Sequence, residues 1–287
     1  MVTVKDPGSA YRPGDTRPSW LARLLADRQP LVMGVLNLTP DSFSDGGQFL
    51  DPAKAIAHAR RMIAEGADII DVGAESTRPY GGALRVGAAE ELRRLAPVIA
   101  PLVALGVPVS VDTMKSEVAK WAFDQGAAMI NDVWGLQRDG DMAAIMARNG
   151  LPVVVMHNRD VVDPALDIMA DIAAFFARSL DLAERAGIAR DRIVLDPGIG
   201  FGKTPEQSLT ALARLDQLKG FGLPLLVGAS RKRFIDKVSP APPDRRLGGS
   251  LAAHLLAVAG GARIIRAHDV AATVQALRVT AAIREAR

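Results

Sequence analysis

The sequence predicts a single (β/α)8 barrel, an α/β fold in which eight parallel strands alternate with helices. Short apolar runs alternate with longer segments of helical periodicity from residue 31 onward. The runs are apolar at successive positions, which suits parallel strands covered on both faces. Eight such units in about 255 residues match the size of this barrel. A doubly wound open sheet with extra strands is the alternative, and the regular spacing without a break in composition favours the barrel.

The expected strands are rich in Val, Ile and Leu. In chain order they are Leu31–Thr39, Asp68–Glu75, Pro108–Thr113, Met129–Gly135, Pro152–His157, Ile193–Pro197, Pro224–Ser230 and Ala262–His268. Each is short enough for a strand and is separated from the next by a helical segment, as a parallel sheet with crossover connections requires.

The expected helices repeat apolar residues at a spacing near 3.6. They are Ala53–Glu65, Ala88–Leu105, Ser116–Gln125, Asp141–Asn149, Ala165–Ala186, Pro205–Leu218, Gly249–Ala259 and Val270–Arg284. The first four stop just before a glycine, the preferred left-handed residue at a helix C-terminus. Thr204, Pro205 and Gln207 supply a cap, a first-turn proline and a glutamine three residues after the cap, which together predict a helix start.

Residues 1–28 are expected to form an N-terminal extension, and residues 29–287 the barrel. The extension is polar, carries three prolines and has no apolar core of the signal-peptide type. A short helix over Trp20–Ala26 is expected to cap one end of the barrel.

Composition excludes several classes of protein. The 287 residues are 49% hydrophobic and 23% charged, as in ordinary globular proteins, and they include no cysteine. Disulfides, thiolate nucleophiles and cysteine-based metal sites are therefore absent. No apolar run reaches the roughly 18 residues of a membrane span. A cytoplasmic protein without a membrane partner is expected.

Charge argues against a nucleic-acid partner. The net charge is +3, and residues 1–28 contribute +2 of it through five Lys and Arg against three Asp. The remainder of the chain is nearly neutral. Affinity for a phosphate backbone requires clustered Lys and Arg, and the body of this chain has no such cluster.

Polar residues stand at the ends of all eight expected strands. In strand order they are Asn37; Asp71 and Glu75; Asp112; Asn131 and Asp132; His157; Asp196; Ser230, Arg231 and Lys232; Arg266 and His268. Barrel enzymes place their chemistry at the C-terminal ends of the strands. A single such residue is explained equally well by a helix cap or a turn. Eight polar ends, each costing about 1–3 kcal/mol if buried without a partner, are better explained by a ligand pocket.

The chemical types are sorted around the ring. Strands three, four and six carry hydrogen-bonding groups for a heterocycle with several N–H donors: Asp112, Asn131 and Asp196. Strands seven, eight and one carry groups that suit an anion such as a phosphate or diphosphate: Lys232, Arg266, His268 and Asn37. The pattern predicts a polar heterocycle that carries a phosphate, without naming the heterocycle.

Other features have simpler interpretations. The glycine-rich segment 198–204 lacks the spacing of a nucleotide P-loop. It is expected to let the backbone approach a flat ligand, with a tight turn as the alternative. His58 and His254 lie within expected helices and are interpreted as structural. From the pattern alone, Met156 fits the core better than a ligand contact.

Several motifs together resemble the dihydropteroate synthase family. Residues Met33–Gly47 are similar to its first signature, and Glu75–Pro79 resembles its second-loop motif. The other motifs follow in the same order: Ser110–Thr113, Ile130–Asp132, Asp196–Lys203, Ser230–Lys232 and Arg266–Asp269. The resemblance covers residues 31–287. After His157, Asn158, Arg159 and Asp160 replace the family's more usual Met-Gln-Gly.

The resemblance implies a reaction. The enzyme joins 6-hydroxymethyl-7,8-dihydropterin diphosphate to p-aminobenzoate, releasing diphosphate and forming 7,8-dihydropteroate. This is a step of folate biosynthesis and the target of sulfonamides. The resemblance also implies Mg²⁺ as cofactor and a homodimer formed through late barrel helices.

The resemblance also implies roles for residues that match the family's motifs. The implied pterin-binding residues are Asp112, Asn131, Asp196 and Lys232. The implied diphosphate-binding residues are Arg266, His268 and Asn37, with Asn37 also binding Mg²⁺. Catalysis is assigned to Asp112, Lys232, Arg266 and His268. Further substrate contacts are Met156, Phe201 and Gly228, and a p-aminobenzoate pocket is expected from Phe43, Thr77, Arg78 and Pro79.

Two other functions fit parts of the pattern. A catalytically silent homologue would bind the pterin without condensing it. A pterin-binding barrel such as a methyltetrahydrofolate:corrinoid methyltransferase would lack the first-loop asparagine signature and the Arg-x-His pair, both of which are present here at Asn37, Arg266 and His268.

Overall fold

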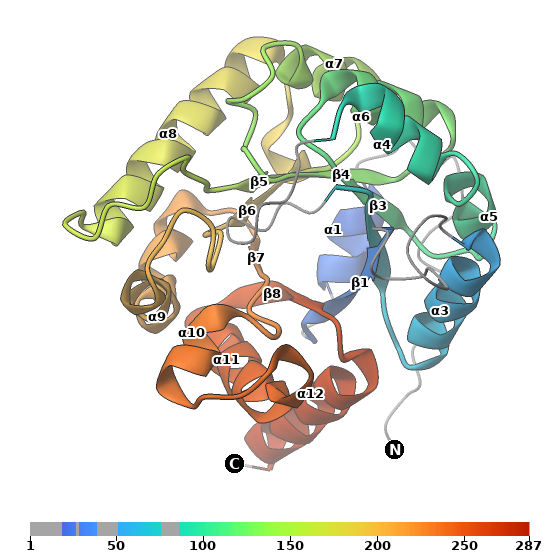
Figure 1. Cartoon of the computed structure of the whole chain (residues 1–287). Coiled ribbons are helices and arrows are strands. Elements are labelled where there is room, and N and C mark those ends of the chain that lie inside the picture. The colour runs from blue at the N-terminus through green and yellow to red at the C-terminus, as the bar shows by residue number, and fades with distance from the viewer. Residues whose placement is uncertain (1–18, 27–28, 39–50, 76–85, 287) are drawn as a thin grey trace.

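The predicted (β/α)8 barrel is confirmed. A computed structural model of the chain describes residues 19–26, 29–38, 51–75 and 86–286. Eight parallel strands pair in chain order, and the eighth closes on the first (Figure 1). The strands are β1 Leu31–Asn37, β2 Ile69–Gly73, β3 Val109–Asp112, β4 Met129–Asp132, β5 Val153–Met156, β6 Ile193–Asp196, β7 Leu225–Val227 and β8 Ala262–Ala267.

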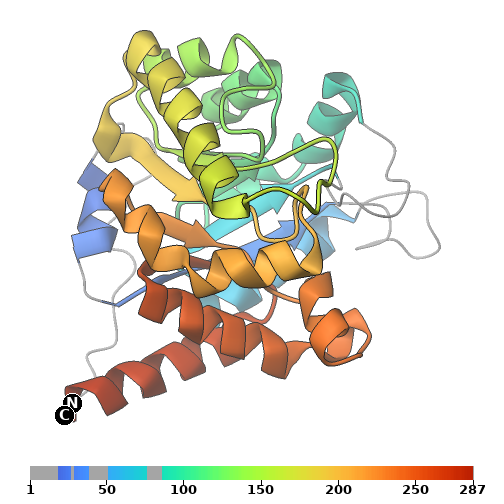
Figure 2. The ribbon, with the colours of Figure 1, turned by 90° about the vertical axis from the view of Figure 1, so that its left-hand side faces the viewer.

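Helices surround the strands on the outside, apart from the first one (Figures 1 and 2). In the described ranges the α-helices are α1 Ser19–Ala26, α3 Pro52–Ala64, α4 Ala88–Leu95, α5 Ile99–Val103, α6 Ser116–Asp124, α7 Met142–Asn149, α8 Ile168–Ala186, α9 Pro205–Ala213, α10 Arg233–Val238, α11 Leu247–Gly260 and α12 Val270–Glu285. Short 3-10 turns are η2 Arg190–Arg192, η3 Leu215–Phe221 and η4 Pro243–Arg245.

The elements differ from the sequence-based prediction at several places, and three of the differences have a local cause. The helix expected over 88–105 is two helices, α4 and α5, because Pro97 has no N–H to continue the ladder. The strand expected to reach Gly135 stops at Asp132, whose carboxylate accepts from the N–H groups of Trp134 (2.9 Å) and Leu136 (2.6 Å) and so forms a turn. Helix α10 was missed because its six residues are too few to show a helical period.

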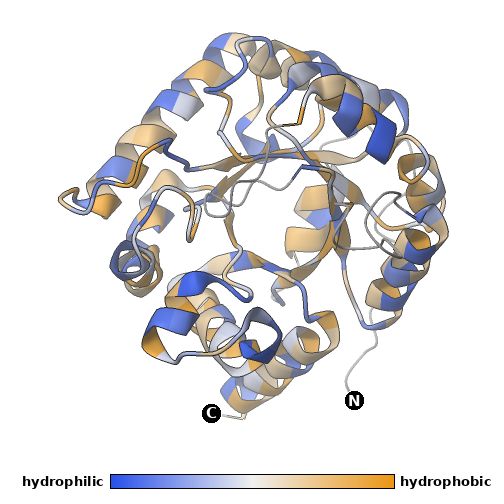
Figure 3. Ribbon diagram, viewed as in Figure 1, coloured by the Kyte–Doolittle hydropathy of each residue, from blue (hydrophilic) through white to orange (hydrophobic). Residues whose placement is uncertain are grey.

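The barrel has two apolar layers. The larger one lies between the outer face of the strands and the surrounding helices, and the strands are hydrophobic along most of their length (Figure 3). The smaller one fills the lower interior, meaning the interior at the N-terminal ends of the strands. There Trp20 and Leu21 of α1 pack on residues such as Leu31, Met129 and Ile264. The short helix expected at 20–26 is therefore present and closes the N-terminal end of the barrel (Figure 2).

Helix α1 is hydrogen-bonded to the last strand. Arg263 of β8 donates from Nη2 to the carbonyl oxygen of Leu25 at 2.6 Å. With this end closed, the opposite end, where the strands terminate, is left to carry a site. Within the described ranges, the helices include none that is both long enough and apolar enough to cross a bilayer.

Replacing Trp20 by alanine is expected to lower the free energy of unfolding by about 3–5 kcal/mol, the usual loss for a fully buried aromatic side chain. Trp20 is fully buried in the lower interior. Urea unfolding followed by circular dichroism measures the change. The control is Leu24→Ala, at a partly exposed position of the same helix. If both variants lost the same free energy of unfolding, the packing of Trp20 would not be a main contribution to the stability of the barrel.

Candidate active site

The ends of the first four strands lie at one height. The sheet register aligns Asn37 with Gly73, Gly73 with Asp112, and Asp112 with Asn131. Since adjacent parallel strands end at the same rim, these residues form one row along four of the eight strands. Gly73, between Asn37 and Asp112 in this row, contributes no side chain, and a Cβ there would lie 3.6 Å from the Cβ of Asp112.

Arg266 links four strands across the barrel interior. Its Nε donates to Asp71 Oδ2 at 2.7 Å and its Nη2 donates to Asp112 Oδ2 at 3.1 Å. Asn131 Nδ2 donates to the same Asp71 oxygen at 3.1 Å. Strands β8, β2, β3 and β4 are therefore joined by one charged network, in which the buried carboxylates offset the positive charge of Arg266.

This network leaves acceptors without a partner. Among the described residues, Asp112 Oδ1 and Asn131 Oδ1 are buried and accept no hydrogen bond. A buried acceptor left in that state costs about 1–3 kcal/mol. Two such atoms side by side at the strand ends indicate a place for a ligand that brings N–H donors.

The pKa of Asp112 also indicates a place for a ligand at the strand ends. Burial raises the pKa of Asp112 to about 8, against the lowering effect of the Arg266 charge. The ionised form is therefore disfavoured in this site, which lacks enough donors by itself to stabilise the carboxylate. A ligand with N–H groups or a developing positive charge would stabilise the carboxylate.

Asp196 and Lys232 form the opposite part of the site. Asp196 Oδ1 accepts from the N–H of Gly198 at 2.7 Å, and the carboxyl is almost completely buried. Burial raises the pKa of Asp196, opposed by the charge of Lys232. Burial likewise lowers the pKa of Lys232 to about 7, opposed by Asp196. The charged form of each group is therefore stabilised by the charge of the other.

The Lys232 ammonium rests on the loop after β6. Its Nζ donates to the carbonyl oxygen of Ile199 and lies 4.3 Å from the centroid of the Phe201 ring. Gly200 has a left-handed φ of +79°, and a Cβ there would come within 3.2 Å of Lys232 Cδ. The absence of a side chain at residue 200 therefore allows Lys232 to cross the loop.

The loops after β7 and β8 hold His268. Ser230 Oγ accepts from the backbone N–H of His268 at 3.2 Å and lies 3.0 Å from its Nδ1. Arg231 has a φ of +59°, unusual for a residue with a side chain. It is held there by a two-point ion pair with Asp269, at 2.9 and 2.5 Å. No residue pattern predicts this ion pair, which holds the segment between Ser230 and Lys232.

Of the remaining predicted site residues, Met156, Gly228 and Asn37 lie within the described part of the chain. Met156 is buried and pairs in register with Asp196. Gly228 follows β7, and a Cβ there would lie 3.7 Å from the Cβ and Cδ atoms of Arg266. Asn37 is partly exposed at the end of β1. The predicted residues Phe43, Thr77, Arg78 and Pro79 lie outside the described residues.

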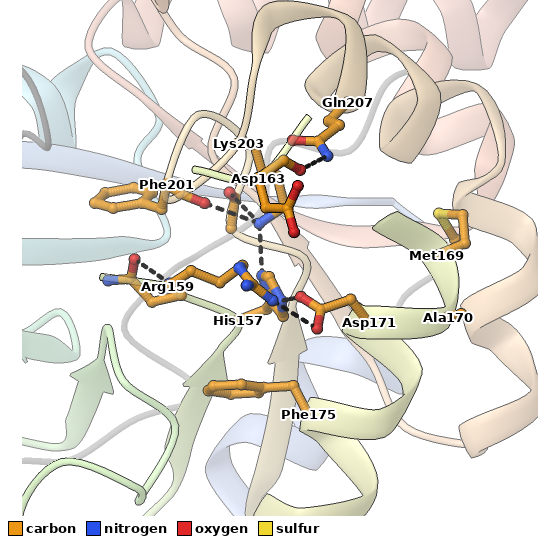
Figure 4. Close-up of polar contacts among 12 residues, drawn as sticks. His157, Arg159, Asp163, Met169, Ala170, Asp171, Phe175, Phe201, Lys203 and Gln207 are labelled. Carbon is orange, nitrogen blue, oxygen red and sulfur yellow. Dashed lines mark hydrogen bonds and ion pairs between the residues drawn. The ribbon is translucent and has the colours of Figure 1, made fainter. Parts of the chain in front are cut away.

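Three of the polar residues at strand ends are bound by other protein groups. Strands β2 and β4 also carry Asp71 and Asn131, so the structure departs from the expectation at β5. His157 is completely buried between Asp171 and Lys203 (Figure 4). Asp132 closes the turn after β4, as described above. Glu75 accepts from Lys115 Nζ at 2.5 Å and from the backbone N–H of Val86.

Lys203 is a residue whose importance the sequence did not reveal. It is 1% exposed, and its Nζ lies 2.6 Å from His157 Nδ1. Burial lowers its pKa well below the usual value. In the sequence, Lys203 stands within a glycine-rich segment and at the end of the Asp196–Lys203 motif, and neither feature predicts that its side chain is buried. The predicted structural role of His254 fits its position, buried between α11 and α12, where burial lowers its pKa to about 4.

Known proteins are similar to this chain in both sequence and fold. Residues 33–268 match the family model described as pterin binding enzyme. A dihydropteroate synthase of Bacillus subtilis (strain 168) is 45% identical over 256 residues, which are 89% of this chain and 88% of that protein.

Solved structures agree with this. A Clostridium difficile dihydropteroate synthase, determined in the presence of pteroic acid, superposes with a TM-score of 0.85 at 47% identity, over 89% of this chain and 97% of that one. A Xanthomonas albilineans dihydropteroate synthase with 4-aminobenzoic acid superposes with a TM-score of 0.85 at 46% identity, over 90% of this chain and 94% of that one. The similarity spans the barrel and every strand end described above.

Proposed function

This chain belongs to the pterin binding enzyme family, and on that premise we propose that it carries out the dihydropteroate synthase reaction. It joins 6-hydroxymethyl-7,8-dihydropterin diphosphate to p-aminobenzoate and forms 7,8-dihydropteroate and diphosphate. The observation that carries the proposal is the meeting of Asp112, Asn131 and Asp196 with Lys232 and Arg266 at one rim of the barrel.

The pterin ring is held by the acceptors that the protein leaves unused. Asp112 Oδ1 and Asn131 Oδ1 have no partner among the described residues, and Asp196 is buried with its second oxygen available beyond the Gly198 contact. These acceptors receive the N–H groups of the pterin, and the Lys232 ammonium donates to a ring acceptor. Charge-assisted hydrogen bonds of this kind are the strong ones.

The diphosphate is placed on the other side, against Arg266, His268 and Asn37. Asn37 stands beside the side-chain-free Gly73 in register, and its amide oxygen is a hard donor of the kind that Mg²⁺ prefers. Mg²⁺ often takes only one or two protein ligands and completes its shell with phosphate oxygens and water, so a site at Asn37 is compatible with the ion. When bound, Mg²⁺ neutralises charge on the diphosphate.

The reaction substitutes nitrogen for oxygen at the pterin methylene carbon. The bond from this carbon to the diphosphate oxygen breaks, and the leaving oxygen keeps the electron pair, stabilised by Arg266 and His268. The pterin ring delocalises the positive charge left on the carbon, and the Asp112 carboxylate stabilises it. The aniline nitrogen of p-aminobenzoate then attacks this carbon and loses a proton, which passes to water or to the released diphosphate. No protein nucleophile is required.

The proposal is tested by mixing the purified protein with the pterin diphosphate, labelled p-aminobenzoate and Mg²⁺. Labelled dihydropteroate is expected, together with one diphosphate for each product molecule. If no product forms, the proposal fails. Retained pterin binding without product would then identify a silent pterin-binding homologue.

A homodimer is proposed as the assembly. Helices α11 and α12 pack together, and each exposes large apolar side chains: Leu256 on α11 is 67% exposed, and Val279 and Ile283 on α12 are 53% and 60% exposed. Exposed apolar side chains in the last two helices suit a contact with a second copy. The cytoplasmic location expected from the sequence stays a prediction.

The double variant Leu256→Asp, Val279→Asp is expected to be monomeric, because two carboxylates in an apolar interface lose their hydration without gaining partners. Light scattering after gel filtration measures the mass. The control is Val161→Asp, an equally exposed apolar residue in the loop between β5 and α8. A wild-type monomer, or a double variant that remains dimeric, would rule out this interface.

A further inference from the structure

A buried cluster lies directly beneath the loop that follows β6. Lys203 Nζ is within hydrogen-bond distance of His157 Nδ1 (2.6 Å), the Gly198 carbonyl oxygen (2.9 Å) and the Phe201 carbonyl oxygen (3.1 Å) (Figure 4). An ammonium group has three donors. The three acceptors around Lys203 match them in number.

The far side of His157 fixes its tautomer. His157 Nε2 lies 2.9 Å from Asp171 Oδ2, and Arg159 Nη1 donates to Asp171 Oδ1 at 2.8 Å. Although burial acts in the opposite direction, the hydrogen bonds from His157 and Arg159 keep the pKa of Asp171 below its usual value. The carboxylate therefore only accepts, so the imidazole proton is on Nε2.

The tautomer determines the charge of Lys203. Burial is the largest cause that lowers the pKa of His157 to about 3, so the imidazole is neutral and its Nδ1 is an acceptor. Although burial also lowers the pKa of Lys203, its Nζ must donate to all three of its neighbours, which only the ammonium form can do. A charged lysine thus sits beneath the loop and binds two of its carbonyl groups.

The loop is seated tightly on this cluster. Gly198 has a left-handed φ of +64°, and a Cβ there would lie 1.9 Å from the carbonyl oxygen of His157. A Cβ at Gly202 would lie 2.5 Å from the Cβ of Arg159. Both glycines are therefore required by packing against residues 157–159, which favours the tight-turn interpretation of the glycine-rich segment at these two positions.

Lys232 contacts the same loop. The carbonyl oxygens of Gly198 and Phe201 bind Lys203, whereas the carbonyl oxygen of Ile199 and the ring of Phe201 contact Lys232. A change in the loop at residues 198 or 201 must therefore move the groups on which Lys232 rests.

We propose that Lys203, oriented by His157 and Asp171, is a positioning residue that fixes the 198–203 loop and thereby places Phe201 and Lys232 for substrate. This inference deepens the proposed function and rests on it. Lys203 does not touch the reacting groups; it acts through the backbone of the loop.

The test is the variant Lys203→Met, which keeps the length of the side chain and removes its donors. The KM for the pterin diphosphate is expected to rise about tenfold, since small displacements of binding groups have effects of this size or larger. The kcat is expected to change less, within about threefold, because the reacting groups themselves remain. A variant that was only less stable would lower the active fraction and hence kcat, with KM unchanged.

Two further variants complete the test. Lys120→Met makes the same change at an exposed lysine of α6 and is expected to leave KM within about twofold. Asp171→Asn keeps the shape of the cluster and is expected to raise KM about threefold, in case Lys203→Met does not fold. Unchanged KM in the folded Lys203 or Asp171 variant, or a loss of kcat alone, overturns the inference. Failure of the wild-type protein to form dihydropteroate would overturn the proposed function instead.

Discussion

Replacing Lys232 by alanine is expected to lower kcat/KM for the pterin diphosphate by about tenfold or more, since a charge-assisted hydrogen bond contributes about 1.5–3 kcal/mol. The side chain crosses the loop after β6 at Gly200, and its ammonium reaches the Ile199 carbonyl and the face of Phe201. Alanine removes both contacts and leaves Asp196 without its neighbouring positive charge. Steady-state kinetics at varied pterin diphosphate measures the effect.

The matched control is Lys237→Ala, an exposed lysine of α10 five residues further along the chain. Its kcat/KM is expected to stay within about twofold of the wild-type value. If Lys232→Ala behaves like this control, Lys232 has no part in binding the substrate.

Lys232 is also expected to make the fold less stable at neutral pH. Its pKa is about 7 in the folded protein and near 10.5 when the side chain is fully hydrated. Between these values the unfolded chain binds more protons, so this residue's contribution to stability rises with pH. At and below pH 7 the folded state holds an ionised amine where burial disfavours it.

Lys232→Met is therefore expected to unfold at a higher urea concentration than the wild-type protein at pH 6.5. The difference should shrink as the pH approaches 10, where the wild-type amine is neutral. Urea midpoints across this range measure the trend. A difference that is constant with pH would show that Lys232 does not titrate abnormally in the folded state.

Asp196→Asn is expected to reduce kcat/KM for the pterin diphosphate by about tenfold to a hundredfold, the equivalent of one lost charge-assisted hydrogen bond. The asparagine oxygen can still accept from the Gly198 N–H, so the loop is retained. Its other atom becomes an NH₂ group, which faces the N–H donors of the pterin in place of an acceptor. The loss should appear in binding of the pterin as well as in turnover.

The control for this change is Asp191→Asn, an exposed residue of η2 just before the same strand. Because burial raises the pKa of Asp196, its neutral replacement is not expected to destabilise the fold. An Asp196→Asn protein that turns over like the wild type would exclude Asp196 from the pterin site.

The sequence predicts this fold well because its information is local and repeated. Each strand is a short run rich in apolar residues, and glycines at 66, 106, 126 and 150 mark where helical periodicity stops. The errors arise where a local group overrides the pattern. Pro97 splits one helix, and the Asp132 carboxylate ends a strand early by binding two backbone N–H groups.

The site is predicted less completely, because a position at a strand end does not determine the direction of a side chain. Asp112, Asn131, Asp196 and Arg266 meet as expected. His157 follows its strand in the same way, but its ring turns into the layer beneath the pocket, where Asp171 and Lys203 bind it. These partners are 14 and 46 residues away along the chain, a separation over which residue patterns carry no signal.

The most direct test of the account is a crystal structure of the protein with the pterin diphosphate and Mg²⁺. The account predicts the ring N–H groups at about 3 Å from Asp112 Oδ1, Asn131 Oδ1 and the Asp196 carboxylate, with the diphosphate against Arg266 and His268. A pterin bound elsewhere, with those buried acceptors still unpaired, would contradict it.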